Sequence, residues 1–173
     1  MKKLVALVMA LCLLGACALA ETAVINWKDI EPVIEEKGLN GKFFTVNAVN
    51  VKFWVPEGLE PVEELPEELK SRDIVALFAD EDLEKGITVV YTDLHGKTIE
   101  EYADALPDYG ADHISVEVIN GLTAVEYANP QKGNLTVGFL SDTGKLLEIT
   151  MSPVNQEVPE IEWAVLVGSI QPA

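Results

Sequence analysis

The 173-residue sequence contains only two cysteines and two histidines, which limits how it can be cross-linked. Both cysteines, Cys12 and Cys17, lie near the N-terminus, so the rest of the chain has no thiol with which to form a disulfide. The two histidines, His95 and His113, are too few for the three or four ligands that a zinc site needs. Stability must therefore come from a hydrophobic core.

Basic residues are also scarce. The chain has 12 Lys and Arg residues against 29 Asp and Glu residues, for a formal net charge of −17 at pH 7. Nucleic acids and anionic lipid surfaces are bound through basic surfaces, which this composition does not favour. We expect no nucleic-acid partner, and contact with a membrane only through a lipid anchor. The negative charge favours solubility and would also attract a cationic partner.

The usual catalytic motifs are absent from the sequence. No Gly-x-Ser-x-Gly motif surrounds a serine, and no glycine-rich phosphate loop follows a predicted strand. We therefore predict a non-catalytic binding or cell-envelope accessory protein without a cofactor, whose partner is an envelope protein or a glycan. The alternative is a hydrolase that acts on wall or glycan substrates with two carboxylates, since 29 acidic residues make chance pairs inevitable.

The N-terminus has the pattern of a bacterial export signal. Lys2 and Lys3 precede an apolar run at 4–14, and small residues end the segment at Ala20, just before Glu21. The apolar run is shorter than the roughly 20 residues that span a bilayer. We expect cleavage between Ala20 and Glu21 and a secreted, extracytoplasmic protein. Loss of the two lysines changes the net charge to −19.

A second way of processing this signal stays open. Leu14-Gly15-Ala16-Cys17 resembles a lipobox, in which Cys17 would be lipidated and would anchor a membrane lipoprotein. With cleavage after Ala20 the sequence predicts three segments: a signal peptide at 1–20, a helical arm at 21–41 and one α+β domain at 42–173.

The arm has the pattern of a short amphipathic helix. Asn26 is a candidate N-cap, Trp27 a candidate anchor against the domain, and Gly38 a candidate stop. Pro32 has no backbone N–H, so either the helix begins late or it is kinked there.

Alternating apolar residues predict β-strands in the remaining domain. Asn120-Gly121 predicts a hairpin between the strands at 113–119 and 122–128, and Asp142-Thr143-Gly144 predicts one between 134–140 and 145–151. The strands at 73–79 and 87–94 form a further predicted hairpin. In the strand at 113–119 we place Ile114, Val116 and Val118 toward the core, and Ser115 and Glu117 on the wetter face.

Two helices complete the predicted domain. Thr98 and Glu101 form a capping box at the start of the first, and Pro159 suits the first turn of the C-terminal helix. Gly168 would let the C-terminal helix approach a sheet closely. The fold class is therefore α+β, a mostly antiparallel sheet with packed helices, preceded by the helical arm.

The order of these elements resembles the PsbP-like fold family. The resemblance is carried by Val55-Pro56-Glu57-Gly58, by Ile87-Thr88-Val89-Val90-Tyr91 leading into Thr98-Ile99-Glu100-Glu101-Tyr102, by Val118-Ile119-Asn120-Gly121-Leu122, and by Gly168-Ser169-Ile170. It covers roughly residues 42 to 171, while the arm resembles that of a secreted bacterial subgroup of unknown function. The resemblance implies a small extracytoplasmic protein with a non-enzymatic accessory or binding role.

Two sets of residues are candidates for a site. Asp80, Glu81, Asp82 and Glu84 place four carboxylates within five residues, which suits calcium by ligand type but lacks the spacing of a known calcium loop. A solvated turn is the alternative. Trp54 is either a core or arm-docking residue, or an exposed aromatic that contacts a glycan or a partner protein.

Overall fold

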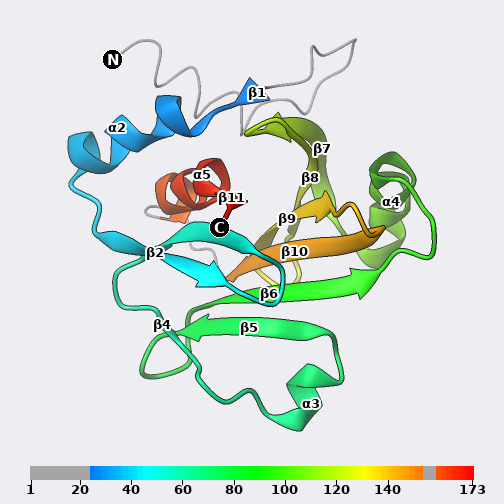
Figure 1. Cartoon of the computed structure of the whole chain (residues 1–173), viewed down its shortest axis with the longest axis horizontal. Coiled ribbons are helices and arrows are strands. Elements are labelled where there is room, and N and C mark those ends of the chain that lie inside the picture. Colours follow the sequence, from blue (N-terminus) through cyan, green and yellow to red (C-terminus); the bar gives the residue numbers. More distant parts are fainter. Residues whose placement is uncertain (1–23, 154–158) are drawn as a thin grey trace.

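The structure is a computed structural model that describes residues 24–153 and 159–173. A large sheet has the strand order β1-β7-β8-β9-β10-β6-β5-β4 (Figure 1). Only the pairing of β1 with β7 is parallel, and the other neighbours are antiparallel. The strands are β1 (Val24–Ile25), β4 (Glu60–Pro61), β5 (Ile74–Ala79), β6 (Gly86–Asp93), β7 (Asp112–Ile119), β8 (Leu122–Asn129), β9 (Asn134–Leu140) and β10 (Lys145–Ser152).

A second, three-stranded sheet contains β2 (Gly41–Val46), β3 (Val51–Pro56) and β11 (Gln171–Pro172), in the order β11-β3-β2. It packs against the large sheet through aromatic contacts. The ring of Phe78 on β5 lies 5.0 Å from that of Phe44 and 5.7 Å from that of Phe53. The two sheets therefore share one part of the core, near β5.

Helices cover both faces of the large sheet. The helical elements are α2 (Trp27–Lys37), α3 (Glu67–Lys70), α4 (Ile99–Ala105), a 3-10 helix (Leu106–Tyr109) and α5 (Pro159–Ser169). Figure 1 shows α4 on one side of β7–β10, and α5 with α2 on the other. Two apolar clusters correspond to these layers, one around α4 and a larger one around α5, α2 and the small sheet. The predicted α+β class is confirmed.

Local signals in the sequence give the predicted turns and caps. Asn120 and Gly121 join β7 to β8 with φ values of 49° and 85°, as a type I′ turn requires. Thr98 and Glu101 form the complete capping box at the start of α4. The predicted hairpins β7–β8 and β9–β10 are confirmed, and because these four strands are consecutive neighbours in the sheet they form an antiparallel meander.

The arm differs from the prediction in several details. α2 begins directly at Trp27, with Pro32 in its interior, and the Asn26 side chain makes no capping hydrogen bond. The expected stop at Gly38 is confirmed, with a left-handed φ of 64°. The arm also adds β1 to the large sheet, because Val24 and Ile25 pair with β7. This strand is only two residues long, too short for an alternating pattern to predict it.

The prediction that Gly168 lets the C-terminal helix approach a sheet is wrong, because the neighbour at this glycine is helix α2. A Cβ atom at Gly168 would lie 2.6 Å from Cγ1 of Ile30, so this glycine lets α5 approach α2 and not a sheet. Asn120 secures the same region, because its side-chain Oδ1 accepts from the Trp27 backbone N–H and its Nδ2 donates to the carbonyls of Gly168 and Ile170. One turn residue thus ties the arm, the meander and the C-terminal helix together.

Candidate functional site

A groove of about 380 Å³ separates the small sheet from the outer end of the large sheet. Among the residues that the structure describes, thirteen line the groove, of which ten are apolar and one, Glu63, is charged. The lining comes from three segments: β2 and the turn after it, β4 and the residues that follow, and β5. Its members are Phe44, Thr45, Val46, Asn47, Ala48, Pro61, Val62, Glu63, Leu65, Val75, Ala76, Leu77 and Phe78.

One wall of the groove is an open strand edge. β2 pairs with β3 along its whole length, from Gly41 to Val46, and is the outermost strand of the small sheet. Its other edge has no strand partner among residues 24–153 and 159–173. Phe44, Thr45 and Val46 line the groove on this edge. An extended chain placed there could form main-chain hydrogen bonds with β2.

The opposite wall is a strand made only of apolar residues. β5 reads Ile-Val-Ala-Leu-Phe-Ala, and all of its residues except Phe78 are partly exposed. On its outer side β4 pairs only with Ala79 and Phe78, and Val62 donates one further bond to the carbonyl of Leu77. Natural proteins guard strand edges with charges, prolines or covering segments, because bare apolar edges recruit other chains. On β5 the covering strand β4 protects only the end that carries Phe78 and Ala79.

Acidic side chains border the groove. Glu60, Glu63 and Glu64 are all exposed on the segment that leads from β4 to α3, which also carries Glu67 and Glu68. Glu60 forms an ion pair with Lys42 of β2, with its Oε1 3.0 Å from the ammonium nitrogen. This pair links the two sheets beside the groove, and Glu63 and Glu64 make no ion pair within the described residues.

A second depression, of about 310 Å³, lies between the β5–β6 turn and the end of β10. It is lined by residues that include Glu57, Lys85 and Glu162. Burial raises the pKa of Glu162, and the Lys85 charge acts in the opposite direction. Pro153 also lines this depression, and residues 154–158 lie outside the described part of the chain.

The calcium candidates form the turn beside this depression. Asp80 Oδ1 accepts hydrogen bonds from the backbone N–H groups of Glu84 and Lys85, at 2.8 and 3.1 Å, and so holds the turn together. Glu81, Asp82 and Glu84 are exposed. Within the described residues no three Asp, Glu, His or Cys side chains gather as a metal site would require. Calcium binding stays a prediction.

Trp54 is a core residue, and its interpretation as an exposed contact aromatic is wrong. Its side chain is 2% exposed, and its backbone N–H donates to Ser169 Oγ of α5 at 2.7 Å. Its ring also crowds the position at which a Cβ of Gly41 would lie. Trp163 of α5 is likewise buried. Trp27 anchors the arm through an edge-on contact with Phe43, with ring centroids 5.4 Å apart.

Two glutamates lie beneath α5, Glu117 buried and Glu126 partly buried, which the alternating pattern of their strands did not predict. Glu117 of β7 is only 3% exposed, although the alternation of its strand placed it on the wetter face. Its Oε1 accepts from Ser115 Oγ at 2.8 Å. Glu126 of β8 lies on the same sheet face and accepts from the indole N–H of Trp163 at 2.5 Å. Within the described residues, the Oε2 atoms of both glutamates are buried and have no hydrogen-bond partner.

Burial raises the pKa of both carboxyl groups. The pKa of Glu126 rises to about 7, because the loss of water outweighs the Trp163 hydrogen bond and the nearby Glu117 charge adds to the rise. Burial also raises the pKa of Glu117, against a smaller opposing effect of the Ser115 hydrogen bond. A raised pKa is typical of catalytic acids as well as of structural groups. Neither glutamate lines either of the two depressions above.

A third glutamate joins α4 to the opposite face of the sheet. Glu148 Oε1 accepts from the hydroxyls of Tyr102 and Tyr127, at 2.7 and 2.6 Å. The pKa of each tyrosine is raised, first by burial and then by the Glu148 charge. A carboxylate that accepts two hydroxyl hydrogen bonds is well compensated for its burial, so this cluster is a structural link between α4 and the sheet.

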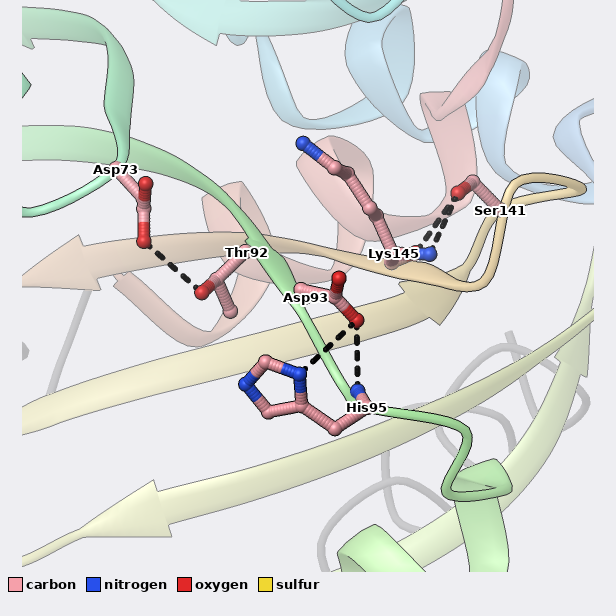
Figure 2. Close-up of polar contacts among 6 residues, drawn as sticks. All are labelled: Asp73, Thr92, Asp93, His95, Ser141 and Lys145. Carbon is pink, nitrogen blue, oxygen red and sulfur yellow. Dashed lines mark hydrogen bonds and ion pairs between the residues drawn. The ribbon is translucent and has the colours of Figure 1, made fainter.

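Polar residues at the end of β6 and at the β9–β10 turn do not form a catalytic arrangement (Figure 2). Ser141 Oγ exchanges hydrogen bonds with the backbone of Lys145, and Figure 2 shows the Lys145 ammonium pointing away from it. His95 has a positive φ of 53°, its N–H donates to Asp93 Oδ1, and its imidazole is exposed. His95 therefore belongs to the turn between β6 and α4.

His113 also lies next to an aspartate. Adjacent strand residues normally point to opposite faces, yet His113 Nε2 lies 3.6 Å from Asp112 Oδ1. The pairing of β7 with β8 is irregular between Asp112 and Ser115, and His113 has a positive φ of 51°. Both side chains are exposed and contact no third catalytic group in the described structure.

The predicted processing residues, Cys17, Ala20 and Glu21, lie outside the described residues. In the part that is described, no helix is both long and apolar enough to cross a membrane.

Comparisons with known proteins identify the fold but not a close relative. No family model and no curated protein sequence matches the chain. The solution structure of cyanobacterial PsbP (CyanoP) from Synechocystis sp. PCC 6803 is similar, with a TM-score of 0.53 and 13% identity over 92% of this chain and 99% of that chain. The Saccharomyces cerevisiae Ran-binding protein Mog1p gives a TM-score of 0.44 at 13% identity, over 78% of this chain and 96% of that chain. The chain thus has the PsbP-like fold that its sequence resemblance implied.

Proposed function

We propose that this protein is a non-catalytic, extracytoplasmic binding module whose partner docks in the groove between β2 and β5. The observation that carries the proposal is the composition of the groove walls. An open strand edge faces a partly exposed strand of six apolar residues, and the cavity between them is lined mainly by apolar side chains. Binding sites in soluble proteins are typically concave and lined mainly by apolar side chains, with few polar groups.

The chemistry of the groove supports binding over catalysis. Glu63 is the one charged side chain among the described residues that line it, so these residues do not supply the two convergent carboxylates that such a hydrolysis would need. The glutamates with the buried, unpaired oxygens, Glu117 and Glu126, lie beneath α5 on another part of the sheet. We therefore place the hydrolase alternative second, because the groove does not bring two carboxyl groups together.

The proposed location rests on the N-terminal sequence. The segment has the features of an export signal: basic residues at its beginning, a short apolar run, and small residues that end at Ala20. This pattern favours export and cleavage before Glu21. Lipidation at Cys17 would instead hold the same domain at a membrane surface. The N-terminal mass of the exported protein distinguishes the two: a chain that starts at Glu21 is secreted, whereas a diacylated Cys17 identifies a lipoprotein.

Site-specific photo-crosslinking in the producing cell tests the function. A photoreactive benzoylphenylalanine replaces Thr45, which is exposed and lines the groove, and in a control chain it replaces Leu122, which is exposed on β8. We expect a discrete crosslinked product from position 45 and none from position 122. The absence of a product at position 45, or the same product from both positions, would refute the proposal.

A further inference from the structure

We infer that the groove binds an extended, cationic polypeptide segment, which adds a strand to the open edge of β2 and buries its apolar side chains against β5. This inference rests on the proposed function, because it names the class of partner for the same groove. Strand addition of this kind gains affinity from main-chain hydrogen bonds, and specificity from pockets for alternate side chains.

The backbone of β2 is suited to receive a strand. All six of its residues pair with β3 on one side, from Gly41↔Pro56 to Val46↔Val51, so the strand is held in register. On its other side no strand is paired in the described structure. The N–H and C=O groups that point to that side are fixed in position before any partner arrives, which lowers the entropic cost of binding.

The side chains opposite β2 are suited to alternate apolar residues. Val62, Leu65, Val75 and Leu77 line the groove and are partly exposed. An extended segment places every second side chain on the same face. If that face is apolar, it fills the groove between β2 and β5, while the intervening side chains point toward the rim.

The acidic residues at the rim of the groove, Glu63 and Glu64, favour a cationic segment as the occupant. Glu63 and Glu64 are exposed next to the groove, and no described basic side chain forms an ion pair with them. A whole-chain charge of −17 strengthens the attraction for basic residues. The same charge opposes a second copy of this chain as the occupant, because two strongly acidic surfaces would have to approach each other. We therefore assign the groove to a basic segment of another protein.

Binding of synthetic peptides to the exported protein tests the inference. The probe is a fluorescein-labelled nine-residue peptide in which lysine and valine alternate. Its binding to the protein is measured by fluorescence anisotropy. Its controls are a glutamate–valine peptide, a serine–valine peptide, and a lysine–valine peptide that is N-methylated on every residue so that neither edge can donate hydrogen bonds. We expect binding of the unmethylated lysine–valine peptide, at least tenfold weaker binding of the N-methylated peptide, and no binding of the glutamate–valine peptide.

Charge reversal at the rim provides the matched variant. Replacement of both groove-side glutamates, Glu63→Lys with Glu64→Lys, should weaken binding of the lysine–valine peptide about tenfold, as expected for the loss and reversal of two exposed charges. The control, Glu35→Lys with Glu36→Lys on exposed positions of α2, changes the net charge equally and should leave binding within about twofold.

The outcomes separate this inference from the proposed function. Equal weakening by both charge reversals, or equal binding of the N-methylated peptide, would show general electrostatic attraction and overturn strand addition. Preference for the serine–valine peptide, or self-association of the protein that competes with the probe, would also overturn the cationic partner. A photo-crosslink at position 45 without peptide binding would overturn this inference alone, whereas the loss of both signals would overturn the proposed function as well.

Discussion

The buried carboxyl group of Glu126 gives the sharpest prediction on stability. Its pKa is about 7 in the folded protein, against an ordinary value of 4.5. Between these two pH values the folded chain retains a proton that the unfolded chain has lost, so the free energy of unfolding falls as the pH rises. At about 1.36 kcal/mol per pH unit, the difference corresponds to about 3 kcal/mol of stability that is present below pH 4.5 and lost above pH 7.

The substitution Glu126→Gln imitates the protonated side chain. The amide oxygen can still accept the hydrogen bond from Trp163, and the shape of the side chain is almost unchanged. We expect the variant to be more stable than the wild type by about 2–3 kcal/mol at pH 8, and equal to it within about 0.5 kcal/mol at pH 4.5. Glu81→Gln, an exposed position in the β5–β6 turn, removes the same charge and is the control.

Chemical unfolding at constant ionic strength, followed by tryptophan fluorescence at pH 4.5, 6 and 8, measures the effect. The Glu81→Gln control should differ from the wild type by no more than about 0.5 kcal/mol at each pH. If Glu126→Gln gains no more than this control at pH 8, the carboxyl group is solvated or compensated, and the description of a buried, half-satisfied glutamate is wrong. Stability of the wild type that rises between pH 5 and 8 would contradict it as well.

Three further substitutions test the packing and the links between elements. Gly168→Ala should destabilise the protein by about 1–3 kcal/mol because its Cβ would overlap Ile30, and part of that loss should disappear in an Ile30→Ala background, as a double-mutant cycle of unfolding would show. Asn120→Ala should cost about 2–4 kcal/mol through three lost hydrogen bonds and a positive φ, and should release α2, seen as faster amide exchange there. Tyr127→Phe should lower the free energy of unfolding by about 1.5–3 kcal/mol, because it removes a hydrogen bond to a charged group. An unchanged free energy of unfolding would show that other groups already satisfy Glu148.

Local signals predicted the hairpins and caps because the information lies within a few residues. Asn120-Gly121 adopts the positive φ values that its turn needs, and Thr98 finds its capping partner three residues later. Neither feature depends on what packs above the strand. The predicted fold class followed from these elements, because one mostly antiparallel sheet with covering helices is their simplest arrangement.

The buried glutamates could not be predicted in this way. The alternation in 113–119 correctly separates two faces of a strand, but a pattern of polar residues cannot show that α5 covers the face that carries Glu117. The same holds for Gly168, whose partner is α2 and not a sheet. Both facts depend on contacts between segments that are far apart in the sequence, and those contacts are set by the assembled fold.

The groove could not be predicted because its two walls carry no motif. β2 reads Gly-Lys-Phe-Phe-Thr-Val and β5 is a plain apolar run, and each resembles an ordinary buried strand. Only the order of strands shows that β2 is an edge and that β4 covers just two residues of β5. The one sequence signal is the acidic stretch from Glu57 to Glu68, whose charge suits a cationic partner but does not reveal a groove beside it.

Backbone amide exchange with and without the lysine–valine peptide tests the central claim most directly. If an extended basic segment pairs with β2, the amides between Lys42 and Val46 that point away from β3 should exchange more slowly in the complex, while those of Leu122 and its neighbours on β8 should not change. Unaltered exchange along β2 at saturating peptide, or protection confined to another surface, would contradict docking of the partner in this groove.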